Sequence, residues 1–322
     1  MTRASKAERM LEPLLTFGDE RLAPWVVAHE AGFRLGAFLG VFLLMAGFEL
    51  LVPRRALVLP KLRRWRANLT LTALNTVLVR LLLPGAVVSA AMVAAEQRWG
   101  VLNRVDLPPV AEMMLAIVAF DLVIYLQHVM FHAVPALWRL HMVHHADLDF
   151  DVTTGTRFHP LEIFLSIFIK LALVLLLGPS AVAVVMFEVL LNATSMFNHG
   201  NVRLPDALDR VLRWFVVTPN MHRVHHSMNA AEANSNFGFS LSWWDRLLGT
   251  YLDKPSASDE EMCIGVELLQ ETGPQGLAWM LRLPFVGGLP AIQPLPGPAR
   301  PHVLEAPCPG SRPSCRASRP AI

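Results

Sequence analysis

Long apolar stretches separated by short polar segments dominate the first two thirds of the chain. A helix needs about 20 mainly apolar residues to cross a bilayer. Five stretches approach or exceed this length, at residues 35–52, 68–95, 110–131, 161–177 and 180–196. The second contains Arg80 and Pro84 and predicts either one kinked span or a broken pair. Gly178 and Pro179 separate the last two stretches and predict the turn of a helical hairpin.

The two ends of the chain lack this apolar pattern. Residues 1–31 are largely polar, and no basic start is followed by the short apolar core of a signal peptide. Ten of the 24 prolines lie at or after Pro284, where periodicity disappears. We therefore predict three parts: a polar N-terminal segment (1–31), a membrane domain (32–285) and a Pro-rich disordered tail (286–322).

The basic residues between the spans predict an orientation. The segment 53–66 contains six basic side chains and no acid, whereas the connection 96–109 contains only Arg98 and Arg104 as bases. Loops rich in Lys and Arg face the cytoplasm. Counting crossings from segment 53–66 predicts an external N-terminus and places the histidine-rich segments on the cytoplasmic side. The predicted localisation is an integral, multi-pass membrane protein.

Composition supports a membrane protein and narrows its chemistry. Hydrophobic residues make up 53% of the chain and charged residues 17%, with a mean hydropathy of +0.41, which is unusual for a soluble enzyme. The net charge of +2 gives no basic field for nucleic acid. Three cysteines are too few for a disulfide scaffold. Ten of the 12 histidines lie in the 99-residue window 128–226, where an even spread would place about four.

The histidines form spaced motifs. One HxxxH motif closes the third apolar stretch, at His128 and His132, and two HxxHH triplets begin at His141 and His222. Thr218 and Pro219 predict a helix start before the second triplet. On a helix, positions i, i+3 and i+4 share a face, so we expect the three imidazoles of each triplet to converge. Imidazole suits iron, zinc, copper or nickel. Eight motif histidines and the single His159 and His199 exceed the coordination of one ion, but suit two ions with four or five nitrogens each. We therefore predict an all-α fold, an integral-membrane helical bundle whose cytoplasmic helical cap carries a histidine-rich di-metal site.

Two spans carry a further polar stripe. Asp121, Tyr125, His128 and His132 have the same offsets as Glu188, Asn192, Ser195 and His199. A ligand histidine usually donates its second N–H to a carboxylate or carbonyl. We therefore assign Asp121, Glu188 and Asn192 to the site, with the two acids orienting ligand histidines; the alternative is hydrogen bonding between helices alone. Arg157 and Glu162 flank His159 and either pair with each other or support the site.

Residues 65–285 resemble the fatty acid hydroxylase/sterol desaturase superfamily. The resemblance rests on six segments in order, which are DLVIYLQHVMFH, LWRLHMVHH, RFHPLE, FNHGN, TPNMHRVHH and NSNFGFSLSWWDRLLGTY. It implies a membrane di-iron enzyme that hydroxylates or desaturates an unactivated C–H position of a fatty acyl, sterol or isoprenoid lipid, with O2 as co-substrate. The implied metal ligands are His128, His132, His141, His144, His145, His222, His225 and His226, together with His159 and His199. The chain departs from the family pattern at Val129, where members often have Arg, and in having the single His199 in place of a further HxxxH pair.

The resemblance also implies cofactors and partners, and alternatives remain open. We expect two iron ions, with zinc possible by substitution, and electrons from a separate cytochrome b5-like, ferredoxin-like or other reductase. The donor would dock near the cap, for example on the basic segment 54–66, which is equally suited to anionic lipid headgroups. The first alternative is an ether-lipid monooxygenase of the same superfamily. A zinc-dependent membrane hydrolase is less suited, because such a site needs about three protein ligands and neither HExxH nor GxSxG occurs. A non-catalytic metal carrier or scaffold is the last alternative.

Overall fold

The computed structural model describes residues 22–258, 261–270 and 275–288. Within these ranges the chain forms helices and loops and no strand, apart from three isolated β-bridges, so the predicted all-α fold is confirmed. The helices are α2 (Leu22–Ala28), α3 (Glu30–Leu51), α4 (Lys61–Leu82), α5 (Ala86–Glu96), α6 (Pro109–Ala133), α7 (Pro135–His145), α8 (Pro160–Leu177), α9 (Ala181–Asn198), α10 (Asp206–Leu212), α11 (Pro219–His225), α12 (Ala230–Ala233), α13 (Trp243–Leu248) and α14 (Leu277–Arg282). Short 3-10 turns join several of them, including η2 (Thr154–Thr156).

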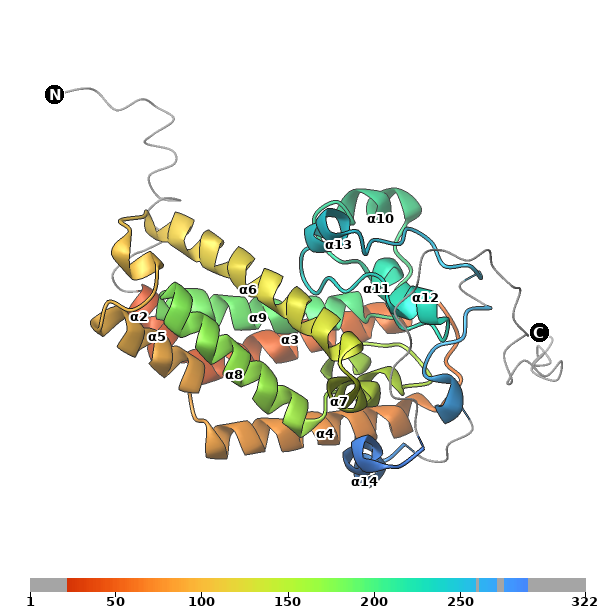
Figure 1. Cartoon of the computed structure of the whole chain (residues 1–322). Coiled ribbons are helices and arrows are strands. Elements are labelled where there is room, and N and C mark those ends of the chain that lie inside the picture. Colours follow the sequence, from red (N-terminus) through yellow and green to blue (C-terminus); the bar gives the residue numbers. More distant parts are fainter. Residues whose placement is uncertain (1–21, 259–260, 271–274, 289–322) are drawn as a thin grey trace.

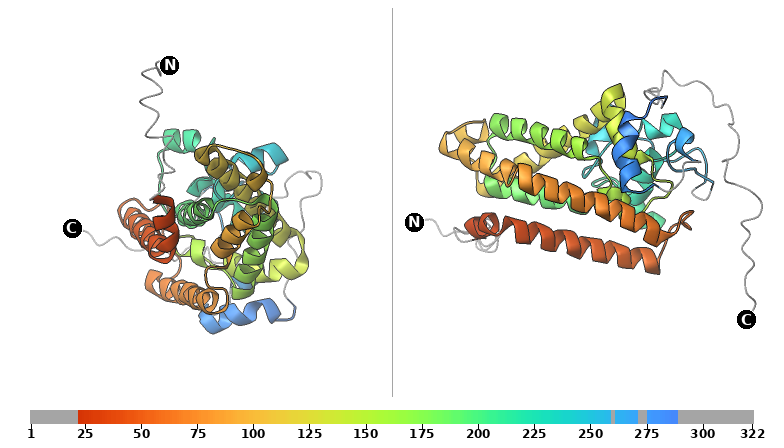
Figure 2. Two further views of the ribbon diagram at one scale, coloured as in Figure 1. Left: turned by 90° about the vertical axis from the view of Figure 1, so that its left-hand side faces the viewer. Right: turned by 90° about the horizontal axis from the view of Figure 1, so that it is seen from below.

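Five helical segments of the described chain are long and apolar enough to cross a membrane. They are α3, the pair α4–α5, α6, α8 and α9. The long helices lie side by side along one direction, while α7 and α10 to α13 gather at one end of the bundle (Figures 1 and 2). We refer to this end as the cap end. Large apolar side chains such as Leu43, Leu81 and Leu176 remain more than 65% exposed on the outside of the bundle, as expected for a surface in contact with lipid.

The second span is the broken form of the two predicted alternatives. Helix α4 ends at Leu82 and α5 begins at Ala86, and together they cover 36 residues. Pro84 lacks an amide hydrogen and disfavours helical geometry at the residue before it. Gly85 follows with φ +61°, in the left-handed region that favours glycine.

Helix ends follow the signals in the sequence. The predicted hairpin between α8 and α9 is confirmed: Gly178 ends α8 with φ +69°, and the Ser180 side chain accepts a hydrogen bond from the backbone N–H of Ala183. Thr218 caps α11 in the same way, with Pro219 at the first helical position. These caps determine where the spans and the histidine helices begin.

The bundle core is packed between the spans. Phe120 of α6 and Phe187 of α9 stack with ring centroids 4.7 Å apart, and Val88 and Ala91 of α5 lie in the same cluster. An apolar core of this kind holds the spans at fixed depth relative to one another. It therefore determines which side chains of different helices meet at the cap end.

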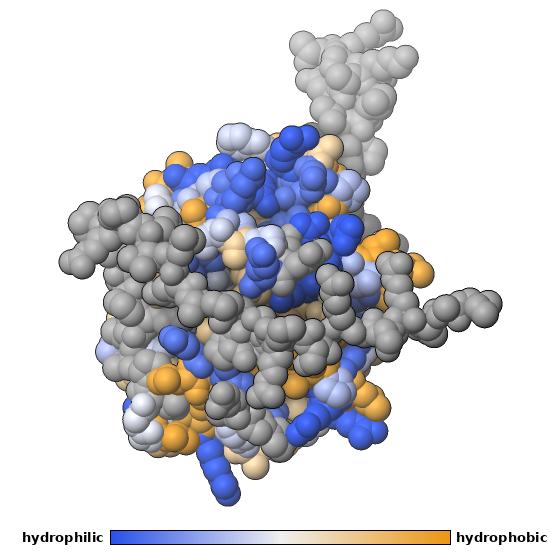
Figure 3. Space-filling model, turned by 90° about the vertical axis from the view of Figure 1, so that its right-hand side faces the viewer, coloured by the Kyte–Doolittle hydropathy of each residue, from blue (hydrophilic) through white to orange (hydrophobic). Residues whose placement is uncertain are grey.

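All ten clustered histidines lie at the cap end, where α3, α6 and α9 end and α4 and α8 begin. The basic segment 53–66 lies at the same end, since Arg55 donates to the carbonyl of Met262 and Arg64 pairs with Asp147. Many hydrophilic side chains cover this end, with hydrophobic residues in smaller patches (Figure 3).

The predicted domain limits meet the structure only in part. Helix α2 and the first residues of α3 already fall within the segment 1–31, because the first span begins at Glu30 rather than after residue 31. Residues 1–21 of that segment, and 289–322 of the proposed tail, lie outside the described residues.

Candidate metal centre

Nine of the ten predicted histidines form two adjacent groups at the cap end. Within each group the nitrogen atoms that face the others lie within 4.8 Å of one another, and every imidazole is at most 4% exposed. The five-histidine group is His128, His132, His141, His145 and His225, and the four-histidine group is His144, His199, His222 and His226. The number of nitrogens per group agrees with the prediction of four or five for each ion.

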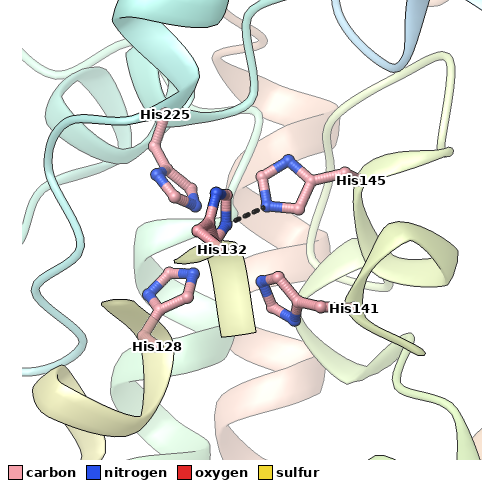
Figure 4. A group of neighbouring side chains, drawn as sticks. All are labelled: His128, His132, His141, His145 and His225. Atoms are coloured by element: carbon pink, nitrogen blue, oxygen red, sulfur yellow. Dashed lines mark hydrogen bonds between the residues drawn. The ribbon is translucent and has the colours of Figure 1, made fainter. Parts of the chain in front are cut away.

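The five-histidine group draws on three helices. His128 and His132 lie one turn apart on α6, His141 and His145 one turn apart on α7, and His225 ends α11. Their rings surround a common centre (Figure 4), and the Nε2 atoms of His132 and His145 are 3.2 Å apart. Spacing of i and i+4 places each pair on one helix face.

The four-histidine group is centred on His199, the residue that ends α9. Its Nε2 atom lies 3.1 Å from Nε2 of His144 and 3.1 Å from Nε2 of His222. His226 completes the group, with its ring centroid 5.1 Å from that of His199. Helices α7, α9 and α11 therefore meet at this group.

The prediction that each HxxHH triplet converges on one point is wrong. His141 and His145 belong to the five-histidine group, whereas His144 belongs to the other; in the second triplet, His225 is separated from His222 and His226 in the same way. At about 100° per residue, positions i+3 and i+4 lie on opposite sides of position i and differ by roughly 100°. Each triplet therefore contributes histidines to both groups.

Hydrogen bonds from the cap orient the rings. The Nδ1 atoms of His128 and His225 lie 2.8 Å from the carbonyl oxygens of Phe237 and Ser235, respectively. The Nδ1 atom of His141 lies 2.7 Å from Oε1 of Glu162. In all three rings Nε2 is buried and has no hydrogen-bond partner. With Nδ1 protonated, each Nε2 presents a lone pair to the centre of the group.

These features fit metal ions. Nitrogens about 2.1 Å from a shared ion lie about 3.0 Å apart when adjacent at right angles and about 4.2 Å apart when opposite. The observed contacts of 3.1–3.2 Å correspond to adjacent ligands, and the 4.8 Å limit requires only a small contraction. Burying nine imidazoles without such a partner would be costly, because several of their nitrogens have no other acceptor or donor.

Burial keeps the imidazoles of the cap neutral. It lowers the pKa of His141 to about 3 and the pKa of His199 to about 3, and it lowers the pKa of His145 well below the ordinary value. Aromatic rings supply part of this burial, since Phe158 stacks on His144 with ring centroids 4.6 Å apart. The neutral form is the one that binds a metal.

His159 does not belong to either group, so its prediction as a metal ligand is wrong. Its Nδ1 atom accepts a hydrogen bond from the backbone N–H of Leu161 and caps α8, and its Nε2 atom lies 3.4 Å from the carbonyl oxygen of Leu281. The RFHPLE motif contributes Glu162 to the centre instead, one helical turn further on. Glu162 contacts His141 of the five-histidine group, which favours the second of its two predicted roles, support of the site.

The predicted contact of Asp121 with a ligand histidine is wrong. Its carboxylate accepts hydrogen bonds from the backbone N–H groups of Ser240 and Leu241 and from the indole of Trp244. Asp121 therefore ties α6 to the loop that comes after Phe237. The residue just before this loop, Phe237, provides the carbonyl that lies 2.8 Å from Nδ1 of His128.

Glu188 and Asn192 also lie away from the histidines. The Glu188 carboxylate pairs with Lys170 at 2.9 Å and with Arg34, and the Asn192 side chain donates to the backbone carbonyl of Glu188. Helix α9 turns this stripe toward the interior of the bundle, where both residues line a cavity. The nitrogen Nδ1 of His199 instead lies 2.7 Å from the carbonyl oxygen of Ser195.

A buried ionic network supports the loop between α7 and α8. Arg64 of α4 binds both carboxylate oxygens of Asp147, at 2.8 and 2.7 Å, and also Asp151 at 2.6 Å. Arg157 donates to the carbonyl of Val143. Arg64 is 4% exposed and so does not belong to the proposed docking surface of segment 54–66. The sequence revealed the basic residue but not its acidic partners 83 and 87 positions away.

A cavity of about 340 Å³ extends from the centre into the bundle. At the histidine end it is lined by Phe158, Glu162 and Ser195, each of which contacts a ligand histidine. Further along it is lined by both apolar and polar residues of the spans, including Ile124, Ile167 and Gln127. Its volume lies within the range of ligand-binding pockets.

The fold and site together define a multi-pass membrane protein with a buried cluster of histidines that could bind metal ions. Residues 113–250 match the family model described as fatty acid hydroxylase. This stretch contains all nine grouped histidines. This match supports the resemblance to the fatty acid hydroxylase/sterol desaturase superfamily that the motifs predicted.

Named relatives come from three kinds of lipid oxygenase. An ornithine lipid hydroxylase of Rhizobium tropici is 30% identical over 157 residues, which is 49% of this chain and 46% of the relative. An alkylglycerol monooxygenase of Xenopus tropicalis is 30% identical over 142 residues, 43% of this chain and 30% of the relative. A cholesterol 25-hydroxylase of Rattus norvegicus is 25% identical over 169 residues, 51% of this chain and 54% of the relative.

The chain thus spans about half or less of the length of these relatives. No solved structure matches it significantly.

Proposed function

We propose that this protein is a membrane di-iron oxygenase that hydroxylates or desaturates an unactivated C–H position of a lipid, using O2 and external electrons. The observation that carries the proposal is a cavity between membrane-spanning helices whose wall includes Phe158, Glu162 and Ser195, the residues that contact histidines of the two groups. A lipid chain in this cavity would end one layer of side chains away from the histidine groups. The names of the relatives support the same class of substrate.

The donor set favours a redox role over hydrolysis. A hydrolytic zinc site uses about three protein ligands and keeps one position open. Here two neighbouring groups offer five and four imidazoles. When bound, a pair of redox-active iron ions would supply the electrons and the oxidising power that acid–base groups lack for C–H cleavage.

The residues of this chain would hold and isolate the reacting centre. The five-histidine and four-histidine groups hold the ions, and Glu162 with the carbonyls of Phe237 and Ser235 keeps three of the rings in the required orientation. Phe158, between the cavity and His144, shields the centre from water. Apolar residues of the spans position the substrate chain by excluding water from the cavity.

The histidine end would face the cytoplasm. This is supported by the basic residues of segment 53–66, which lie at the same end as the histidines; Arg63 and Arg66 are exposed there. A separate electron donor, cytochrome b5-like, ferredoxin-like or another reductase, would dock at this end, where the path to the metal centre is short.

An ether-lipid monooxygenase is the second candidate. It is favoured by the 30% identity to an alkylglycerol monooxygenase over a stretch that covers 43% of this chain. Both candidates share the metal centre and differ in the bond that is oxidised.

Metal analysis combined with O2 uptake tests the proposal. We expect two iron ions per chain and O2 consumption that depends on added lipid and reductant. Comparing a fatty acid, a sterol and an alkylglycerol as substrates separates the two candidates. A folded, iron-loaded protein that consumes no O2 with any of these lipids would contradict an oxygenase.

A further inference from the structure

A cluster of charged side chains lies at the end of the cavity away from the histidines. Lys170 contacts Glu188 at 2.9 Å, and Arg34 also pairs with Glu188. Arg34 contacts Glu30 at 3.0 Å, and Arg80 contacts Glu30 at 3.1 Å. Four of these residues line the cavity, and Glu30 supports them from α3. We refer to the five as the distal ionic cluster.

The cluster carries one more positive than negative charge. It contains three cations and two carboxylates, and the remaining acidic residue of the cavity wall, Glu162, lies at the histidine end beside His141. Lys170 and Glu188 are each only 11% exposed and occupy the middle of membrane-spanning helices. Burying ionisable groups at this depth costs free energy, so such groups usually pair with one another or with a ligand. A single further negative charge would balance the cluster.

The distance from the cluster to the histidines matches the reach of a lipid chain. Glu188 precedes His199 by 11 residues and Lys170 follows Glu162 by 8, so the cluster lies roughly 12–16 Å from the histidine end at 1.5 Å per residue. An extended alkyl chain advances about 1.25 Å per carbon, given C–C bonds near 1.52 Å. About 10 to 13 carbons therefore separate the two ends of the cavity.

We propose that the cavity binds an amphiphilic lipid by its anionic headgroup, a carboxylate or a phosphate, on the distal ionic cluster. The alkyl chain then extends toward the histidine groups. This inference rests on the proposed function of the cavity as the substrate site. On this assignment the distal ionic cluster selects the headgroup. The length of the cavity determines which carbon is oxidised.

Competitive lipid binding tests the assignment. The full chain in nanodiscs is loaded with a fluorescent fatty acid, which is displaced by palmitate, hexadecyl phosphate or 1-hexadecanol. These competitors share one chain length and differ in the headgroup. We expect the anionic competitors to bind about tenfold more tightly than the alcohol, since hydrogen bonds assisted by charge are the stronger ones. Comparison of palmitate with hexadecyl phosphate identifies the preferred headgroup.

Two variants and a control separate the cluster from general effects. Lys170→Met and Arg80→Gln should each weaken palmitate binding by about tenfold and change hexadecanol binding less than twofold. Arg80 is 42% exposed, so its replacement tests the charge with little risk to folding. Arg210→Gln, at an exposed position on α10, should change neither.

Equal binding of the alcohol and the anions by the unmodified protein would overturn the inference. So would an equal loss for all three competitors in both cluster variants. The assay needs no turnover and therefore separates this inference from the proposed function. A headgroup preference without lipid-dependent O2 uptake would contradict only the function, and O2 uptake without a preference would contradict only the headgroup site.

Discussion

Replacing Glu162 by Gln removes a charge from the metal centre without removing a ligand. The carboxylate accepts the Nδ1–H of His141 at 2.7 Å and lies 5% exposed within the centre. An amide oxygen can still accept this hydrogen bond, but it lacks the negative charge that strengthens the bond and increases the basicity of the ring. We therefore expect weaker metal binding in the five-histidine group and unchanged binding in the four-histidine group.

The magnitude follows from the geometry. Loss of a hydrogen-bond partner to a ligand histidine typically costs 10- to 100-fold in metal affinity, or about 1.4–2.7 kcal/mol. Four other imidazoles of the five-histidine group stay in place, and the amide keeps part of the hydrogen bond. We therefore expect about a tenfold loss for one of two ions, at the lower end of this range.

The assay is a zinc competition with a chromogenic chelator, because zinc occupies the site without redox chemistry. The matched control is His159→Asn, at the N-cap of the same helix and outside both groups. Asn retains the cap, so this variant should bind two ions as tightly as the unmodified protein. Wild-type affinity in Glu162→Gln would refute the orienting role of Glu162, and loss of an ion in His159→Asn would refute the assignment of His159 as a cap.

Other substitutions address the remaining parts of the centre. His144→Ala and His225→Ala remove ligands from different groups, so each should lower the metal content from two ions to about one and abolish O2 consumption, as measured by elemental analysis and an oxygen electrode. Asp121→Asn should cost about 1–3 kcal/mol of stability in thermal unfolding but retain both ions, because it leaves buried donors of the cap without good acceptors; loss of metal at unchanged stability would contradict the anchoring role. Arg64→Met should cost about 3–5 kcal/mol in the same assay, since it removes the closest cation from the buried carboxylates of Asp147 and Asp151; an unchanged melting temperature would contradict this. Gly155→Ala places a Cβ 2.5 Å from a backbone carbonyl of α9. The substitution should therefore displace α9 and reduce metal binding by the four-histidine group. A variant that still binds two ions would show that α9 can move at this contact without loss of metal.

The spans and helix ends could be predicted because their causes are local. Gly178, Ser180, Thr218 and Pro219 act within one turn of the helices that they end or begin. Pro84 predicted an interruption in the second span, but the sequence alone did not distinguish a kinked helix from a broken one. In the structure Gly85 adopts the left-handed conformation that the break requires. Helix α5 then packs against α8 and α9.

The sequence predicted which histidines come together better than it predicted their partners. The spacing of the histidines implied two ions, and nine of ten predicted ligands lie in the two groups. His159 was indistinguishable from a ligand in sequence, because an N-cap and a metal ligand both use a ring nitrogen. The polar stripe with Asp121 and Glu188 was real, but periodicity gives only the face of a helix and not the element that this face meets.

The sequence by itself determined that apolar helices cross a membrane, that their histidine-bearing ends share one side, and that there are enough imidazoles for two ions. These properties depend on composition and on spacing within single helices. Only the tertiary structure decided how each HxxHH triplet divides between the groups, that carbonyls at Ser235 and Phe237 orient two of the rings, and that Arg64 meets acids more than 80 residues away. Those contacts join distant segments, and their geometry depends on how whole helices pack against one another.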